Sequence, residues 1–262
     1  MIKEDEIFNR AELILGSECM ARIANAKVLI VGVGGVGSWC AECLIRTGIR
    51  HLTIVDSDVV CESNINRQLM ATTQSVGEVK VDALKKRLLL INPQAEINAI
   101  QTVYNEETAS GFDLDSYDYV VDAIDGLKDK ALLILQATAS KATLYSSMGA
   151  ALKLDPLRIK VTEFWKVAGD PLAKALRNRF KKSGEFPKRK FKCVYSDERL
   201  PYKTEGKGSL AQITAVFGFT LASLIINGEW RMDNGEWRME NGKWRMENGE
   251  WRMENGKWKM NN

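Results

Sequence analysis

The sequence predicts an α/β protein built on a doubly wound, mostly parallel sheet. Three observations lead to this fold class. Short apolar runs alternate with segments of helical spacing, the first run ends in a glycine-rich turn, and the composition is that of a soluble domain. Of the 262 residues, 45% are hydrophobic and 27% are charged. These shares are ordinary for globular proteins and exclude a fibrous or wholly disordered chain.

The elements follow one another in a regular order. After an amphipathic segment at 6–24, strands are expected at 28–31, 51–55, 96–103, 119–123 and 143–146, and helices at 37–47, 79–91 and 128–140. The helix at 79–91 is indicated by apolar residues on one face and is ended by Asn92-Pro93. From Leu152 the pattern changes to an extended segment at 157–162 and a helix opened by Asp170-Pro171. We therefore divide the chain into an N-terminal helical arm (1–26), a core (27–150), a C-terminal part (151–226) and a tail (227–262).

The C-terminal part ends in an apolar segment, Ser209–Ile226, which carries almost no charge. Its 18 residues reach the lower limit for a membrane span. Because it also contains several hydroxyl residues, Gln212 and Gly218, we expect a helix buried against the sheet. Membrane association through this segment is the alternative.

The tail is a repeat of Asn-Gly-x-Trp-x-Met-x with a period of seven residues, beginning at Asn227. Trp and Met are two and five residues apart instead of the three and four of a coiled coil, and each unit contains the helix-breaking pair Asn-Gly. Disorder or weak structure is therefore expected. An array of short hairpins or a stacking surface is the alternative.

A basic segment precedes the apolar helix. Residues 174–192 hold nine Lys and Arg against the single acid Glu185, although the whole chain has a net charge of only +3. Such a concentration of charge suits a polyanion, and a solvated surface is the alternative. The candidate contacts are Lys181, Lys182, Lys188, Arg189 and Lys190.

The five cysteines are not spaced as a disulfide framework, and the acidic start of the chain lacks the features of a secretory signal. Both observations favour the cytoplasm. Cys40 and Cys43 form a CxxC pair inside a predicted helix, where we expect them to be core residues. A zinc site is not favoured because the chain lacks a second such pair.

The glycine-rich turn follows the apolar run Val28–Val31 and contains Gly32, Gly34, Gly35 and Gly37. Glycine is needed where a side chain would block a tight turn, the approach of a phosphate or the packing of a helix on a strand. The turn thus predicts a nucleotide site in a Rossmann-like domain. Asp56 ends the next strand, where a carboxylate can accept hydrogen bonds from ribose hydroxyls. These features suit NAD and ATP equally.

The residues further along favour ATP. Asp58, Asn64, Arg67, Gln68 and Lys80 follow the second strand, and Asp125 follows a later one. Attack on the α-phosphate of a triphosphate builds negative charge that fixed cations stabilise, and a carboxylate can hold Mg²⁺. Each residue alone also fits a turn or a surface charge. Arg67 and Lys80 argue against an NAD-dependent oxidoreductase.

In these motifs the chain resembles the superfamily of ThiF, MoeB and the ubiquitin-activating enzymes, which adenylate a carboxylate with ATP. The resemblance covers about residues 7–226. It is closest to the branch of tRNA threonylcarbamoyladenosine dehydratases, through residues 35–39, 64–68, 91–93, 119–125, 147–150, 154–156 and 193–198. The missing zinc cysteines also favour this branch. Activation of a ubiquitin-like sulfur carrier is the alternative, and a non-catalytic nucleic-acid-binding relative is a further one.

The resemblance implies roles for residues at these positions. Gly32, Gly34, Gly35, Gly37, Asp56, Asp58, Asn64, Arg67, Gln68 and Lys80 would bind ATP, and Asp125 would bind Mg²⁺. Arg67, Lys80 and Asp125 would also act in catalysis, as would Arg10, which would reach the ATP of the partner subunit in a homodimer. The substrate would be tRNA and not DNA. A monovalent cation and a sulfur-transfer protein are further candidate partners. Cys193 is a candidate thiol, because the many neighbouring cations could lower its pKa and suit a catalytic or sulfur-exchange role, but a buried structural role is favoured.

Overall fold

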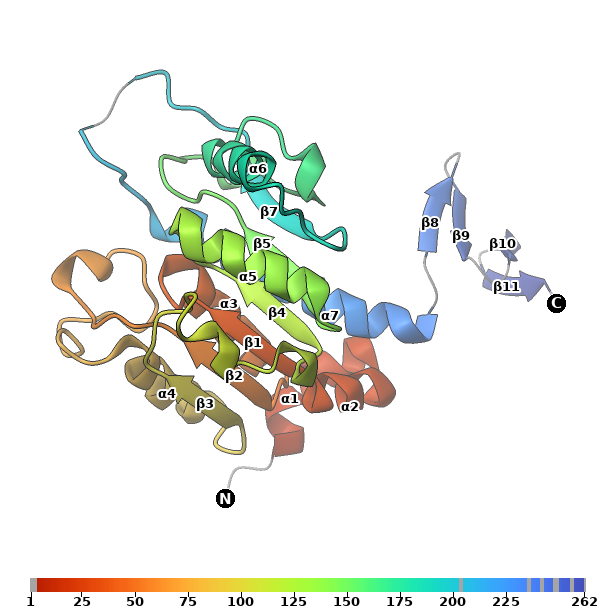
Figure 1. Cartoon of the computed structure of the whole chain (residues 1–262). Helices are drawn as coiled ribbons and strands as arrows, with labels where there is room; N and C mark the ends of the chain where they lie inside the picture. Colours follow the sequence, from red (N-terminus) through yellow and green to blue (C-terminus); the bar gives the residue numbers. More distant parts are fainter. Residues whose placement is uncertain are drawn as a thin grey trace.

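The computed structural model describes residues 4–202 and 205–234, together with four short strands at 237–240, 243–246, 250–254 and 257–261. Its main body is one seven-stranded sheet with helices on both faces (Figure 1). The strands are β1 (Lys27–Val31), β2 (His51–Val55), β3 (Glu96–Ile100), β4 (Tyr119–Asp122), β5 (Thr143–Ser147), β6 (Ile159–Glu163) and β7 (Lys192–Ser196).

The sheet has the strand order β3-β2-β1-β4-β5-β7-β6. All neighbouring strands are parallel except β6, which runs antiparallel to β7 at the edge. The chain therefore leaves β1 toward one side of the sheet and crosses to the other side after β3. Ligands bind at such a switch point, beyond the carboxyl ends of the strands. The predicted doubly wound, mostly parallel fold is confirmed.

Helices cover both faces of this sheet. Successive residues of a strand point to opposite faces, so they pack in two different hydrophobic cores. Val28 and Ile30 pack with α3, α4 and α7, whereas Leu29 and Val31 pack with α5 and α6. The helices are α1 (Glu4–Leu15), α2 (Ser17–Asn25), α3 (Gly35–Arg46), α4 (Lys80–Ile91), α5 (Leu127–Ala139), α6 (Pro171–Ser183) and α7 (Ala211–Asn234). Short 3₁₀ turns are η1 (Glu62–Asn64), η2 (Ala109–Gly111), η3 (Leu114–Ser116), η4 (Pro156–Arg158) and η5 (Phe164–Lys166).

Three elements differ from the sequence prediction. The arm is broken into α1 and α2 at Gly16, whose φ of +80° favours glycine. The third strand ends at Ile100, earlier than the expected residue 103. Strand β7 was not predicted, because its apolar run is short and directly follows the basic segment. Its position inside the sheet is a tertiary effect that no local pattern reveals.

Helix α7 is the predicted apolar helix, and its buried side chains join the core. Gly218 lets it approach α3 closely, because a Cβ atom there would lie 2.6 Å from the backbone oxygen of Val36. By length and composition alone, Ala211–Trp230 could cross a membrane. The contact with α3 instead makes this segment a core helix, as expected.

The helix continues eight residues past the expected end at Ile226, so the division between domain and tail falls within α7. Glu229, in the first repeat unit, is 6% exposed. Its carboxylate accepts a hydrogen bond from the Tyr119 hydroxyl at 2.6 Å, and its backbone oxygen accepts one from Arg22 Nη2 at 2.9 Å. These contacts override the weak helix propensity of Asn-Gly. The first repeat unit thus belongs to the folded domain.

The rest of the tail contains two antiparallel pairs, β8 (Trp237–Glu240) with β9 (Lys243–Met246) and β10 (Glu250–Glu254) with β11 (Lys257–Asn261). In the register of the two pairs Trp237 lies opposite Met246 and Trp251 lies opposite Met260. The described part of the tail therefore contains antiparallel strand pairs, which agree with the alternative of short hairpins and not with disorder. The Asn-Gly pairs at 241–242 and 255–256 lie outside the described residues.

Candidate functional site

The glycine turn joins β1 to α3 at the carboxyl edge of the sheet. Gly32 has a φ of +90°, and a Cβ atom there would lie 2.7 Å from the backbone oxygen of Ala123. At Gly37 a Cβ atom would lie 1.9 Å from the backbone oxygen of Gly32. Both positions therefore require glycine. Since α3 begins at Gly35, its first N–H groups and its dipole face this turn, an arrangement that suits the binding of an anion.

Asp56 supports the turn directly. Its Oδ2 atom accepts a hydrogen bond from the Val33 backbone N–H at 2.9 Å, and its Oδ1 atom accepts one from the Asp58 N–H at 3.0 Å. A carboxylate oxygen has two lone pairs, so each oxygen retains capacity for a ribose hydroxyl. The structure thus places Asp56 where the sequence predicts it and adds a bracing function.

Lys80 and Asp58 meet because the long β2–α4 loop closes on itself. The Val60 N–H donates to the Glu78 oxygen and the Lys80 N–H donates to the Asp58 oxygen, at 2.8 and 3.0 Å. The Lys80 Nζ atom then lies 2.7 Å from Asp58 Oδ2. This ammonium group lowers the pKa of Asp58. The side chain of Lys80 is 7% exposed and that of its partner Asp58 is 64% exposed. The buried lysine thus reaches a carboxylate at the surface, and this contact holds its charge at the edge of the site.

Asn64, Arg67 and Gln68 lie on the turns around η1 in the same loop. Asn64 Oδ1 accepts from the Cys61 N–H at 3.1 Å, and Arg67 Nη1 donates to the Ser63 oxygen at 2.7 Å. The loop is fixed against α3 by Trp39, whose Nε1 atom donates to the Arg67 oxygen at 3.0 Å. Asn64 and Arg67 therefore shape the loop, whatever ligand they contact.

Gln68 faces the glycine turn. A Cβ atom at Gly34 would lie 3.7 Å from its Nε2 atom. Gln68 is 6% exposed, and its Oε1 atom is buried with no hydrogen-bond partner among the described residues. A buried amide oxygen without a partner is costly, and a bound polar ligand would satisfy it. This atom, together with the glycine turn and Lys80, fits the binding of ATP.

A buried cluster at the end of β4 was missed in the sequence. The side chains of Asp122 and Lys130 are both fully buried, with Lys130 Nζ 2.7 Å from Asp122 Oδ2. Ser146 donates to the same carboxylate at 2.6 Å. The signal in the sequence is a lysine on the apolar face of a helix, since Lys130 shares the buried side of α5 with Ile134 and Ala137. A lysine there requires a partner in the core.

Asp125 follows this cluster and is exposed. The described residues contain no group of three or more His, Cys, Asp or Glu side chains arranged to hold a metal ion. Mg²⁺ often binds through one or two carboxylates plus substrate phosphates, so Asp125 next to the glycine turn fits a metal shared with the nucleotide. Cys40 and Cys43 are free thiols whose pKa burial raises, as expected for core residues.

Cys193 does not have the environment of a reactive thiol. It lies on β7 in the interior of the sheet, opposite Ser146, and is fully buried. Burial raises the pKa of its thiol well above the usual value. This excludes the alternative of a low-pKa thiol beside the basic segment and agrees with the favoured structural role, because the side chain points into the core and away from those cations.

The basic segment divides into two kinds of residue. Lys181 and Lys182 end α6, and with Lys188 and Lys190 they are exposed. The guanidinium of Arg189 instead donates to the backbone oxygen of Thr138 at the end of α5, at 3.0 Å, and to that of Ala142 in the segment before β5, at 2.8 Å. Arg189 thus caps a helix, which makes it a poor choice as a test of polyanion binding. Arg10 is exposed on α1, apart from the glycine turn.

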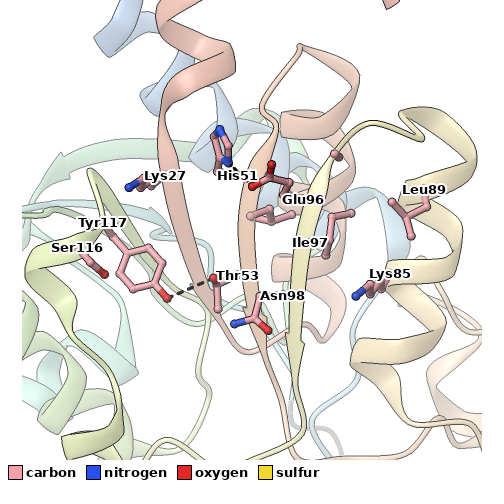
Figure 2. A pocket seen from close by; sticks show the side chains of 12 residues that line it. Lys27, His51, Thr53, Lys85, Leu89, Glu96, Ile97, Asn98, Ser116 and Tyr117 are labelled. Atoms are coloured by element: carbon pink, nitrogen blue, oxygen red, sulfur yellow. Dashed lines mark hydrogen bonds and ion pairs between the residues drawn. The ribbon is translucent and has the colours of Figure 1, made fainter.

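A groove also lies elsewhere on the sheet. It has a volume of about 660 Å³ and lies at the amino ends of β1, β2 and β3, where Lys27, His51 and Glu96 are in register. Figure 2 shows Tyr117 reaching Thr53 across this groove and the His51 ring beside Glu96. The predicted nucleotide residues are at the opposite edge of the sheet. The groove is therefore separate from the candidate site.

Comparison with known proteins decides the family. The sequence profile of the ThiF family matches residues 8–228. The chain belongs to the ThiF family. Among relatives of this ThiF-family chain, the tRNA threonylcarbamoyladenosine dehydratase of Haemophilus influenzae is 37% identical, over 80% of this chain and 88% of the relative. The molybdopterin-synthase adenylyltransferase of Escherichia coli is 29% identical, over 66% of this chain and 68% of the relative.

Solved structures agree with this assignment. The ATP complex of Escherichia coli tRNA N6-threonylcarbamoyladenosine dehydratase, TcdA, has a TM-score of 0.82 and 33% identity to this ThiF-family chain. The alignment covers 89% of this chain and 98% of TcdA. The AMP complex of TcdA has the same TM-score, identity and coverage. The family assignment thus rests on sequence and on fold together.

Proposed function

We propose that this chain is an ATP-dependent tRNA threonylcarbamoyladenosine dehydratase. The observation that carries the proposal is the glycine turn surrounded by Asp56, Gln68 and Lys80, in a chain that aligns along most of its length with dehydratases of this name. The substrate is N6-threonylcarbamoyladenosine at position 37 of tRNA. The reaction closes its side chain into a ring with loss of one water.

The first step is activation of the substrate carboxylate. A carboxylate oxygen attacks the α-phosphorus of ATP, the bond to the β-phosphate oxygen breaks, and an acyl-adenylate and pyrophosphate result. Lys80 and Arg67 stabilise the negative charge that builds on the phosphate oxygens. The turn and the N-terminus of α3 bind the phosphates, and Asp56 orients the ribose. Mg²⁺ at Asp125 would supply further neutralisation of the triphosphate.

The second step is an intramolecular attack. A nucleophile of the same side chain attacks the acyl carbon, the ring closes, and AMP leaves. The net change is dehydration with ATP converted to AMP and pyrophosphate. No enzyme thiol is required, which agrees with the burial of Cys193 in the sheet.

The partners and the location complete the proposal. The chain acts in the cytoplasm as a homodimer in which Arg10 reaches the ATP of the partner subunit. A monovalent cation and a sulfur-transfer protein are additional candidate partners. The exposed position of Arg10 on α1 is compatible with a contact to a second subunit.

The test is incubation of the protein with ATP, Mg²⁺ and tRNA that carries the modified adenosine, followed by mass spectrometry of the nucleosides. We expect the substrate nucleoside to lose the mass of one water, with AMP and pyrophosphate formed. A tRNA lacking the threonylcarbamoyl group is the control. If pyrophosphate forms only with a small protein ending in Gly-Gly, the alternative of sulfur-carrier activation replaces this proposal.

The basic segment supplies a second test, of tRNA binding. Replacing Lys181, Lys182, Lys188 and Lys190 with Gln should weaken tRNA binding and reduce the slope of log affinity against log salt by about one for each lysine that contacts a phosphate. Filter binding over a range of salt concentrations measures both. The control is Gln at Lys85 and Lys86 on α4, with the changes compared per lysine removed. Equal changes in affinity and slope per lysine in the two variants would remove the segment from the tRNA interface.

A further inference from the structure

The buried pair of Asp122 and Lys130 holds both backbone polar groups of one residue, Ile124, next to the glycine turn. Asp122 Oδ1 accepts a hydrogen bond from the Ile124 N–H at 3.1 Å, and Lys130 Nζ donates one to the Ile124 oxygen at 3.0 Å. The two side chains are themselves joined at 2.7 Å. Both polar backbone groups of Ile124 are thus fixed by one ion pair.

The peptide that joins Ala123 to Ile124 lies against the turn. A Cβ atom at Gly32 would lie 2.7 Å from the Ala123 oxygen and 3.2 Å from the Ile124 nitrogen. Asp125 is the next residue, and α5 begins two residues after it, at Leu127. Asp125 lies in the short segment between the end of β4 and the start of α5. The pair of Asp122 and Lys130 therefore determines the path of the backbone that carries Asp125.

Stability alone does not account for the pair. A buried ion pair is often no more stabilising than apolar residues of similar volume, because both charges must be removed from water. Burial raises the pKa of Asp122, while the Lys130 ammonium, the Ser146 hydroxyl and the Ile124 N–H oppose that rise. An aliphatic pair would fill the same space but would leave the N–H and the C=O of Ile124 without these two partners.

We propose that Asp122 and Lys130 are positioning residues, which fix the N–H and C=O groups of Ile124 and thereby hold the Asp125 carboxylate at the glycine turn, where it binds Mg²⁺ together with the triphosphate of ATP. The inference rests on the proposed function, because it concerns the same nucleotide site. It assigns roles to two residues that do not contact the reacting atoms.

The experiment replaces the pair by residues of similar size, in Asp122→Leu/Lys130→Met. ATP affinity is measured by calorimetry with Mg²⁺ and with EDTA, and the exchange of individual backbone amides is measured by NMR. We expect the gain in ATP affinity that Mg²⁺ provides to fall by about tenfold or more, as for other residues that orient a metal ligand. Affinity in EDTA should change little.

Two controls separate positioning from general destabilisation. Ser146→Ala removes one hydrogen bond to Asp122 but leaves both contacts to Ile124, so its response to Mg²⁺ should equal that of the unmodified protein. The Ala123 N–H donates to the Val31 oxygen of β1 and not to the pair. Its exchange should stay slow in the double variant, while the exchange of Ile124 should become about tenfold faster or more.

Either of two results would overturn the inference. One is a folded double variant in which Mg²⁺ improves ATP affinity as much as in the unmodified protein. The other, available even if the double variant fails to fold, is exchange of Ile124 in the unmodified protein as fast as that of an exposed loop. Neither readout uses tRNA, so a protein that binds ATP in this way but leaves the tRNA unchanged would contradict the proposed function and not this inference.

Discussion

Replacing Lys80 with Ala is expected to lower the rate of pyrophosphate exchange into ATP by about a hundred- to a thousand-fold, as removal of one fixed donor does at other sites of developing charge. The ammonium group of Lys80 is held at the site by Asp58, 2.7 Å away, and its side chain is largely buried. The effect should fall on kcat more than on KM if the lysine acts mainly in the transition state. Isotope exchange with labelled pyrophosphate, in the presence of modified tRNA, measures it.

The matched control is Lys86→Ala on the same helix. Lys86 also pairs with a carboxylate at 2.7 Å, that of Glu78, but its side chain is 71% exposed, and such a pair contributes little. Its exchange rate should remain near that of the unmodified protein. Asp58 stays solvated in Lys80→Ala because it is exposed, but loss of the largely buried lysine stem lowers the melting temperature, so exchange is measured below the unfolding transition of the variant. Equal rates for the two variants would remove Lys80 from the catalytic machinery.

Truncation after Ile226 is expected to destabilise the domain by about 3 kcal/mol, because it leaves the buried Tyr119 hydroxyl without its partner and removes the packing of Trp230. For a chain of this size that corresponds to a fall in melting temperature of roughly 10 °C. Truncation after Asn234 keeps the whole of α7 and should leave the melting temperature nearly unchanged. Differential scanning calorimetry on the two truncated chains measures the difference.

Point variants locate the effect within the first repeat unit. Glu229→Ala should reproduce much of the loss, whereas Glu229→Gln keeps an oxygen that accepts from the Tyr119 hydroxyl and should lose less. Both substitutions are made in the full chain, so the repeats after Asn234 are the same in the two variants. If the chain ending at Ile226 has the same melting temperature as the chain ending at Asn234, then residues 227–234 do not stabilise the domain.

The sequence predicted those features that depend on local pattern. The alternation of strands and helices, the glycine turn and Asp56 at the end of β2 were all found from spacing and residue type, because a parallel sheet places its ligand residues at known points along the chain. Lys80 and Asp58 were both singled out, but their contact was not, since it depends on the closure of the β2–α4 loop.

The features that the sequence did not predict depend on distant partners. Strand β7 forms because β5 and β6 offer it two edges, and Glu229 is helical and buried because Tyr119 and Arg22 bind it. Lys130 was interpreted as part of an ordinary helix, although its charge lies on the apolar face. Cys193 was considered beside neighbouring cations in sequence, whereas the alternation of a strand turns it into the core.

Asp56 has a consequence for attempts to redesign this chain. One carboxylate both braces the turn through the Val33 N–H and faces the expected position of the ribose. A change of nucleotide preference in dinucleotide enzymes is commonly sought by replacing the acidic residue at this position. Here such a replacement would also release the phosphate turn, so sugar selectivity and phosphate affinity cannot evolve independently through this residue. A new specificity would require a second substitution that supplies another acceptor for Val33.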